Sequence, residues 1–367
     1  MWWWRPMWGR FDTQLLGMFA DTRTWDVVPD SIPAHAGLSL PPQATATLAR
    51  ILLETGLALT PARSIWNPAA WFAVLRYADS FATQQRRLRL VPGADRWEAR
   101  LLTILAEEVS VGMGMVVARD HLGVRHAADV LPLIEAGEVG YRAPPVDPKH
   151  PEVRPDYLCL DDHEEALFVE MKGSVGTRSA ISRGLSDGKD QVTNVEMLRH
   201  RPRRRAGVVV ADRLVIASHL CIEGRHPNSE TATVVKDPPV VQPEHDDGGR
   251  ASDLAVRLSY AKAFNFADAP VVSRNLLTGS RVNPGLPPPA ELGGWRFQPV
   301  GPCPFGGWIG VEVGVWEALV ASGRGDLSEA LRRPLANVSD LLRKNWAESD
   351  LPAWVLLNNG VALVGGP

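Results

Sequence analysis

The sequence predicts an α/β fold in which a mixed central sheet is flanked by helices, with a helical N-terminal region and a C-terminal region of helices and strands. Two observations support this prediction. Through the middle of the chain, apolar residues recur first at helical spacing and then in strand-like runs. The middle of the chain also lacks tryptophan: eight tryptophans lie between Trp2 and Trp97, five between Trp295 and Trp354, and none in residues 98–294. We therefore expect a central module between two different flanks.

The expected organisation has four parts. A tryptophan-rich helical region covers residues 1–95, the central module 96–223, a linker or excursion 224–252, and a mixed region 253–367. The segment assigned as a linker is polar and proline-rich, which is typical of a connection rather than a core element. With 367 residues, the chain is long enough for two or three domains.

Composition excludes several classes of protein. Hydrophobic residues at 45% and charged residues at 22% are typical of a soluble globular protein. No run approaches the roughly 20 apolar residues that span a bilayer, and the N-terminus lacks the features of a secretory signal. We therefore expect a cytoplasmic protein with no membrane partner. The net charge of −3 excludes a globally basic protein, and three widely spaced cysteines argue against disulfide frameworks and structural zinc.

The N-terminal region contains two predicted helices. Residues 44–54 carry Leu48, Ile51 and Leu52 at helical spacing, and Pro68 is placed to open a second helix. The rest of this region is expected to be irregular.

The central module begins with a long predicted helix over residues 97–122. Glu108 lies on its apolar face, whereas Glu107 does not. A carboxylate on an apolar face needs a partner, which makes Glu108 a candidate functional residue. The alternative is that Glu108 only borders the core. The apolar face consists of Leu101, Ile104, Leu105, Val111 and Met115.

A β-hairpin is predicted after a proline-rich loop. Its strands are the apolar stretches 157–160 and 166–169, and the polar residues 161–164 form the turn.

The hairpin carries the strongest chemical signal in the chain. Side chains two positions apart on a strand share a face, so Glu170 and Lys172 point the same way while Met171 points to the other side. The first strand brings Asp156 alongside them. Two carboxylates and an ammonium are therefore expected at one sheet edge.

Helix and strand signals alternate after the hairpin. A Gly/Ser-rich stretch at 173–188 precedes a predicted helix at 189–200, a strand at 206–211 and a further strand at 215–221. Between residues 172 and 205 there are nine Lys or Arg against three acids. A phosphate-facing surface is expected in this part of the chain.

The C-terminal region is predicted to mix helices and strands. We expect a helix at 253–266, an extended segment at 308–316 and a helix at 327–346 that continues through Pro334. Asn358-Asn359-Gly360 between two short apolar runs is a hairpin signal.

The segment Pro155-Asp156, thirteen intervening residues and Glu170-Met171-Lys172 resembles the PD-(D/E)xK motif of the restriction-endonuclease-like nuclease superfamily. The resemblance covers about residues 97–221. It implies a core of helix, three strands, helix and strand, with the first strand near 138–142, where the sequence signal is poor. Members of this superfamily cut DNA, or sometimes RNA, in restriction, repair, recombination and phage defence. The resemblance therefore implies a nuclease, with DNA as the more frequent substrate.

The resemblance also implies Mg²⁺, or Mn²⁺, as the cofactor. Magnesium prefers oxygen ligands and keeps several waters, so Asp156, Glu170 and the backbone carbonyl of Met171 would form a half-site. Lys172 would orient the nucleophile and offset developing charge.

Two further residues are implied as site members by the same resemblance. Many relatives supply an acid from the first core helix, and Glu108 is the candidate here. Gln191 resembles a glutamine that some relatives place near the active site. The RecB-like group has a tyrosine four residues later, where this chain has Val195, so we do not assign that subgroup.

Contacts to nucleic acid are expected from basic residues that follow the motif. Charge runs are more often solvated loops, so phosphate contact and plain solvation are both open. A homo-oligomer or a partner subunit is also open. The candidates are Arg178, Arg183, Lys189, Arg201, Arg203, Arg204 and Arg205.

Three competing interpretations are weighed against a nuclease. The most serious is a catalytically inactive nuclease fold that acts as a nucleic-acid-binding or scaffold subunit of a larger complex. The segment 184–188 matches the G-x-S-x-G pattern of hydrolases, but no buried strand precedes it. His219, Cys221 and His226 could share a zinc ion, although burial or exposure without metal is the more ordinary outcome.

Overall fold

The computed structural model describes residues 17–30, 40–62, 76–82, 86–141, 153–161, 165–198, 208–209, 212–225, 229–237, 253–280, 286–292, 294–302, 307–322, 327–343 and 354–364. The chain forms two compact units. The first, which we call the sheet unit, comprises residues 24–45 and 79–256 and contains the candidate site. The second, the flanking unit, comprises residues 1–23, 46–78 and 257–367. This division differs from the four parts expected from the sequence, because segments of the N-terminal region and of the expected linker join the central sheet.

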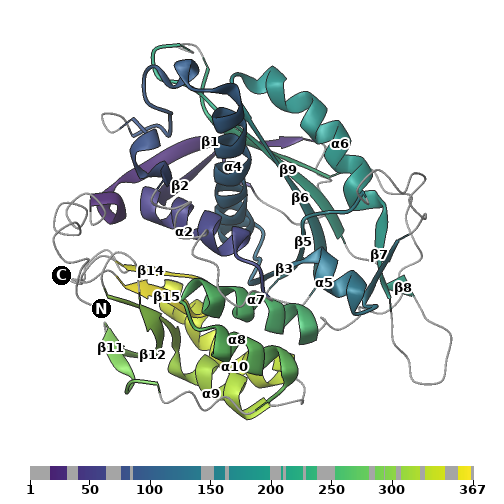
Figure 1. Ribbon diagram of the computed structural model, residues 1–367, viewed down its shortest axis with the longest axis vertical. Helices are drawn as coiled ribbons and strands as arrows, with labels where there is room; N and C mark the ends of the chain where they lie inside the picture. Colours follow the sequence, from purple (N-terminus) through teal and green to yellow (C-terminus); the bar gives the residue numbers. More distant parts are fainter. Residues whose placement is uncertain are drawn as a thin grey trace. The chain divides into compact units, whose positions relative to one another are not determined.

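The sheet unit is built on a curled seven-stranded mixed sheet with helices on its faces, in strand order β2-β1-β10-β9-β6-β5-β3 (Figure 1). The expected α/β class is therefore confirmed. The strands are β1 (Thr22–Asp30), β2 (Gln43–Thr47), β3 (His126–Asp129), β5 (Tyr157–Leu160), β6 (Ala166–Val175), β9 (Asp212–Leu220) and β10 (Ala232–Lys236).

Two of these strands correct the sequence prediction. Residues 22–30 were expected to be an irregular part of the mainly helical N-terminal region, yet β1 is a strand in which Trp25 and Val27 are buried with the period of two that a half-buried strand requires. The expected linker contains β10, which pairs with β1 in parallel and with β9 in antiparallel fashion. The five-residue strand β10 was not predicted, because the residues around it are mostly polar.

The middle of the sheet follows one chain order. β3, β5 and β6 form an antiparallel meander, and β9 lies parallel to β6. The helix α6 (Ser182–Thr193) connects β6 to β9. Together with α4 (Ala99–His121), which precedes β3, these elements read helix, three strands, helix, strand once a short helix and the strands of a second sheet, inserted between them, are set aside.

α4 covers one face of this sheet. A Cβ atom added at Gly114 would lie 3.0 Å from Met171 Sδ, and one added at Gly173 would overlap the Ala106 carbonyl oxygen. The helix confirms the predicted span, but the residues at which it comes closest to the sheet, Ala106, Ser110 and Gly114, are small. Leu101, expected on the apolar face, is 53% exposed. The predicted face of this helix was chosen from the spacing of large apolar residues, so it could not reveal contacts made by small side chains.

Within the described residues, α4 is the single helix long and apolar enough to cross a membrane. This differs from the expectation that no segment of the chain approaches that limit. However, 67% of its apolar window is buried inside the protein. Packing against the sheet accounts for its composition, as for the core helix of a soluble protein.

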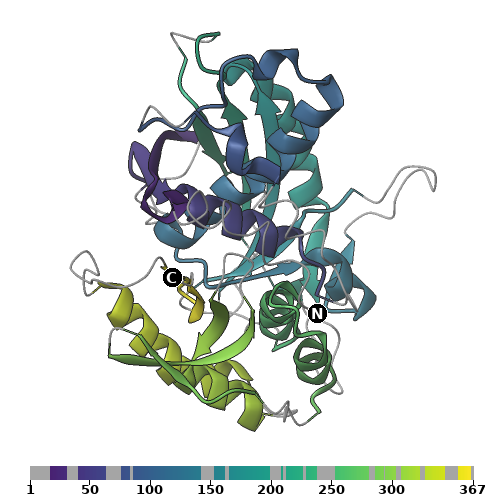
Figure 2. The same cartoon turned by 60° about the vertical axis from the view of Figure 1, so that its left-hand side comes forward.

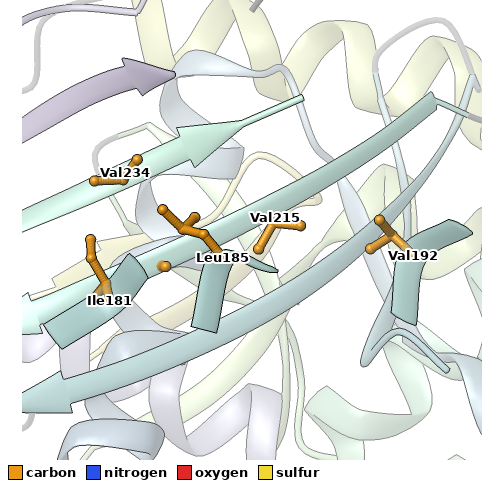
Figure 3. Packing of buried hydrophobic residues seen from close by; sticks show 6 residues of the cluster. Ile181, Leu185, Val192, Val215 and Val234 are labelled. Carbon is orange, nitrogen blue, oxygen red and sulfur yellow. The ribbon is translucent and has the colours of Figure 1, made fainter. Parts of the chain in front are cut away.

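α6 and the 3-10 turn η4 (Arg178–Ile181) cover the opposite face. Figure 3 shows Ile181, Leu185 and Val192 packed over Val215 and Val234 of the sheet. The helix was predicted at 189–200, and that prediction is wrong by about two turns. The Gly/Ser-rich segment before it, for which no helix or strand was predicted, forms the end of β6, η4 and most of α6, and its Gly184 and Gly188 lie where the helix approaches the sheet closely.

A second, three-stranded sheet contains β4 (Val139–Tyr141), β7 (Val195–Leu198) and β8 (Val208–Val209). The first core strand was expected near 138–142, and the strand there is β4, which does not belong to the central sheet. β3 occupies the place beside β5 instead. Likewise, the strand expected at 206–211 is represented by β8, and the neighbour of β6 is β9. The short helix α5 (Val130–Glu135) follows β3.

The flanking unit combines helices with a five-stranded antiparallel sheet, drawn in green to yellow in Figure 2, of order β11-β12-β13-β15-β14. The predicted C-terminal hairpin is confirmed as β14 and β15. Lys262 donates a hydrogen bond to the Ala58 carbonyl at 2.7 Å, which joins α7 to α2. The elements are α2 (Leu48–Leu59), α7 (Asp253–Phe266), α8 (Pro270–Thr278), β11 (Ala290–Leu292), β12 (Trp295–Pro302), β13 (Trp308–Glu312), α9 (Val313–Ser322), α10 (Leu327–Arg343), β14 (Trp354–Leu356) and β15 (Val361–Val364).

Sequence predictions for this unit are largely met. α7 has the predicted bounds, and α10 continues through Pro334. The segment expected to be extended at 308–316 is β13 followed directly by α9. The helix expected at 44–54 is shifted, because Thr47 caps the N-terminus of α2 by accepting a hydrogen bond from the Arg50 N–H at 3.2 Å. The helix expected after Pro68 lies outside the described residues.

Candidate functional site

The hairpin of β5 and β6 brings the three motif residues together. Tyr157 pairs with Val169 in the antiparallel ladder. Asp156, one residue before Tyr157, therefore lies opposite Glu170, one residue after Val169. Asp156 lies in a bend just before β5 and has no regular strand partner, whereas Glu170 and Lys172 lie inside the ten-residue strand β6. The predicted hairpin and the predicted proximity of these residues both agree with the structure.

Asp156 and Glu170 hold each other through backbone groups. The Asp156 N–H donates to Glu170 Oε2 at 2.9 Å, and the Met171 N–H donates to Asp156 Oδ2 at 3.1 Å. Within a strand, the N–H and C=O of one residue point to the same side. The Met171 carbonyl therefore faces the strand edge that carries the Asp156 carboxyl group.

Lys172 completes the arrangement on the same face of β6 as Glu170. Its Nζ atom lies 2.5 Å from Glu170 Oε1. The Glu170 side chain is 1% exposed and the Lys172 side chain 30% exposed. This is a buried acid paired with a partly accessible amine, and it does not resemble a solvated surface pair.

Two glycines of α6 make room for these side chains. A Cβ atom added at Gly184 would lie 3.2 Å from Lys172 Cβ, and one at Gly188 would lie 3.3 Å from Glu170 Cγ and 2.6 Å from Val215 Cγ1. α6 therefore covers the Glu170 and Lys172 face directly. The four-residue spacing of the glycines places both on one side of the helix.

Burial dominates the electrostatics of this site. The pKa of Glu170 is raised to about 8, mainly by burial and then by the nearby Asp156 charge, against Lys172, which lowers it. Removal from water also raises the pKa of Asp156, against the Met171 N–H bond and the Lys172 charge, which lower it. As a residue Asp156 is exposed to solvent, so Glu170 is the more deeply buried of the two acids. Two carboxyl groups share a site in which one lysine cannot balance both as anions.

The donor set matches the preferences of a hard divalent cation. Carboxylate oxygens of Asp156 and Glu170 and the Met171 carbonyl are oxygen ligands of the kind that Mg²⁺ and Mn²⁺ prefer. Each carboxylate oxygen keeps a second lone pair beyond its hydrogen bond. A divalent charge would also relieve the repulsion that raises the Glu170 pKa. Among the described residues there is no group of three or more His, Cys, Asp or Glu able to hold a metal ion, so water and substrate would have to supply the remaining ligands.

Glu108 is not brought to this site. It lies on α4, which packs against the Met171 face, whereas Glu170 and Lys172 point to the α6 face. Ala106, Ser110 and Gly114 of α4 approach the sheet closely, and Glu108 is about 160° around the helix from Ala106 and from Ser110. The proposed helix acid therefore has no geometric support as a fourth site residue.

Gln191 lies near the site but does not reach the carboxyl groups through its hydrogen bond. Its Nε2 atom donates to the Arg154 carbonyl at 3.2 Å, two residues before Asp156. The structure thus connects Gln191 to the segment that leads to Asp156.

The candidate phosphate-binding residues are only partly covered by the structure. Arg178 in η4 and Arg183 in α6 are exposed, and Lys189 in α6 is half-buried. The remaining four, Arg201, Arg203, Arg204 and Arg205, lie outside the described residues.

Sequence reasoning missed one acid near the site. Asp129, at the end of β3, pairs with Tyr157 in the ladder, and its charge contributes to raising the pKa of Asp156. It lies in the short strand 126–129, with no motif or apolar run to mark it. Its proximity follows only from the pairing of β3 with β5.

The competing chemistries find no support in the structure. Ser186 of the G-x-S-x-G match lies within α6 rather than at a turn between strand and helix, as a nucleophile elbow requires. His219 and Cys221 are buried at the end of β9, and His226 lies outside the described residues.

Comparisons of the chain with protein-family models, with curated proteins and with solved structures return no match.

Proposed function

We propose that this protein is a metal-dependent nuclease that hydrolyses phosphodiester bonds, with Mg²⁺ or Mn²⁺ as its cofactor and DNA as the favoured substrate. The observation that carries the proposal is the joined set of Asp156, Glu170 and Lys172. A buried carboxylate contacts a partly exposed lysine and the backbone of a second acid, all within one hairpin.

The order of elements around the site supports the same proposal. α4, β3, β5, β6, α6 and β9 occur in the chain in the order helix, three strands, helix and strand, with β9 parallel to β6, while α5 and the second-sheet strands β4, β7 and β8 are inserted between them. This is the order expected from the resemblance to the PD-(D/E)xK superfamily, although the first strand is β3 rather than the segment near 138–142. The agreement between motif and topology is stronger support than either feature alone.

The residues of the chain have distinct roles in the proposed reaction. A bound divalent ion supplies Lewis acidity toward a phosphoryl oxygen and makes water a stronger acid. Asp156, Glu170 and the Met171 carbonyl would hold that ion. The partly exposed Lys172 side chain lies beside the buried Glu170 carboxyl group, where its ammonium can orient an attacking water and stabilise negative charge that develops on the phosphate.

The substrate and the biological role belong to the proposal too. Arg178 in η4 and Arg183 in α6 are exposed and positively charged. These two elements cover the face of β6 that carries Lys172, so backbone phosphates could bind there. DNA is favoured over RNA by its frequency among proteins with this motif. Restriction, repair or phage defence in the cytoplasm is the corresponding role.

Cleavage assays test the proposal directly. Purified protein would be incubated with linear, circular and single-stranded DNA and with RNA, each with Mg²⁺, Mn²⁺ or EDTA. We expect cleavage of at least one substrate, its loss in EDTA, and a loss of about 100-fold or more in Lys172→Ala. Circular dichroism and urea denaturation of the variant would establish that it remains folded.

Lack of cleavage on every substrate would refute the catalytic proposal. Nucleic-acid binding without cleavage would instead favour an inactive nuclease fold that serves as a binding or scaffold subunit.

A further inference from the structure

We infer that Asn194 and Gln191, at the junction of α6 and β7, are positioning residues that fix Asp156 in place through the backbone carbonyls of Val153 and Arg154. This inference rests on the proposed function, because it concerns the geometry of the proposed metal site. It assigns to Gln191 a role different from direct catalysis, and it adds Asn194, to which no motif pointed.

The two amides form a clamp on the segment before Asp156. Asn194 Nδ2 donates to the Val153 carbonyl at 2.7 Å, and Gln191 Nε2 donates to the Arg154 carbonyl at 3.2 Å. Pro155 follows, with its φ angle fixed by its ring and no N–H to donate. Asp156 is the next residue, so the clamp ends one stiff residue away from the proposed metal ligand.

Asp156 needs such a clamp because the sheet does not fix it. It lies in a bend, outside the ladder that holds Glu170 and Lys172. Its own contacts are the Val130 N–H on its carbonyl at 3.1 Å, together with the bonds to Glu170 and Met171 already described.

The clamp is anchored to the central sheet by Arg213. This buried β9 residue donates from Nε to the Val192 carbonyl at 2.9 Å and from Nη2 to the Val195 carbonyl at 3.2 Å. These two carbonyls flank Asn194 in the chain. A continuous set of hydrogen bonds therefore runs from the sheet, through the α6–β7 junction, to the segment that carries Asp156.

Isosteric substitutions separate positioning from mere stabilisation. Asn194→Asp and Gln191→Glu keep the side-chain shape but replace the donor with an acceptor that faces a carbonyl oxygen. Thr193→Ala is the matched control, since Thr193 lies between the two residues and its hydroxyl bonds only to the Lys189 and Asp190 carbonyls within α6.

The measurement is metal affinity, by isothermal titration of Mn²⁺ into each full-length variant, with the Mg²⁺ dependence of cleavage measured in parallel. We expect Mn²⁺ affinity to fall about tenfold in Asn194→Asp and Gln191→Glu, as for outer residues that orient a metal ligand. The half-saturating Mg²⁺ concentration should rise by the same factor. Cleavage by these variants should recover at high Mn²⁺, and Thr193→Ala should bind Mn²⁺ like the wild type.

The results distinguish the clamp from the nuclease proposal. If the wild type binds Mn²⁺ without cleaving any substrate, and the two variants bind it more weakly, the clamp stands and the catalytic proposal falls. If the two variants lose only thermal stability and keep wild-type Mn²⁺ affinity, the clamp is refuted. A wild type that binds no Mn²⁺ overturns both.

Discussion

Replacing Glu170 by glutamine should remove a large pH dependence from the stability of the metal-free protein. The Glu170 carboxyl group is 1% exposed, and its pKa is raised from 4.5 to about 8 by burial and by the Asp156 charge. The folded state therefore holds a proton on Glu170 that the unfolded state releases at much lower pH. Stability from this group is fully present below about pH 4.5 and is lost as the pH rises toward 8.

The size of the effect follows from these two pKa values. One pKa unit corresponds to about 1.4 kcal/mol, so the full difference of about 3.5 units amounts to about 5 kcal/mol. Between pH 5 and pH 8.5, the window accessible to experiment, the loss is about 4 kcal/mol. This is a large fraction of the roughly 5–15 kcal/mol that stabilises a typical domain. Glutamine is neutral throughout and close in shape to the protonated acid, so Glu170→Gln should match the wild type near pH 5.

Urea denaturation in EDTA at several pH values between about 5 and 8.5 measures this difference. We expect the free energy of unfolding of Glu170→Gln to exceed that of the wild type increasingly with pH, by about 4 kcal/mol at pH 8.5. Added Mg²⁺ should restore wild-type stability at high pH more than at low pH, because only the deprotonated pair binds the ion. Parallel pH profiles for the two proteins would refute the assignment of Glu170 as a buried acid with a raised pKa.

Three other pairs of substitutions test separate parts of the account. Gly188→Ala should destabilise the protein by about 1–3 kcal/mol, because the new methyl group would lie 2.6 Å from Val215 Cγ1, whereas Gly184→Ala, with its methyl group 3.2 Å from Lys172 Cβ, should cost less; urea denaturation compares them. Leu105→Ala should cost about 2–5 kcal/mol and Leu101→Ala less than about 0.5, since only Leu105 is buried, and equal costs would contradict the assigned face of α4. Arg183→Glu should weaken DNA binding and lower its salt dependence by about one unit of slope, while Arg296→Glu, exposed on β12, should leave both unchanged in fluorescence anisotropy titrations.

The elements that the sequence predicted best depend on local patterns. The hairpin of β5 and β6 follows from two apolar runs around a polar turn, and the side-chain alternation in β6 places Glu170 beside Lys172 without knowledge of the rest of the fold. α4 and α7 were placed to within a few residues by their periodicity.

The elements that were missed depend on tertiary packing. Gly184 and Gly188 resemble loop residues in sequence, yet they belong to α6 because only a small side chain allows the helix so close to Lys172 and Val215. For the same reason, the residues at which α4 comes closest to the sheet are small. β10 is a short strand in a polar segment and gains its stability from two neighbouring strands.

In the candidate site, too, local patterns could be predicted from the sequence and tertiary contacts could not. Asp156, Glu170 and Lys172 follow from one hairpin, so the sequence was sufficient to group them. Asn194 donates to a carbonyl 41 residues away, and no periodicity or motif encodes such a contact. Glu108 was grouped with the acids from its position on a helix, and the direction of that helix face could be known only from the sheet it covers.

The central claim is that Asp156, Glu170 and the Met171 carbonyl hold one divalent ion beside Lys172. Anomalous diffraction from crystals grown or soaked with Mn²⁺ tests it most directly. We predict one strong anomalous peak with oxygens of Asp156, Glu170 and Met171 at about 2.0–2.4 Å, and no peak there in Glu170→Gln crystals treated in the same way. Wild-type crystals with no Mn²⁺ between these residues at millimolar concentration would contradict the claim.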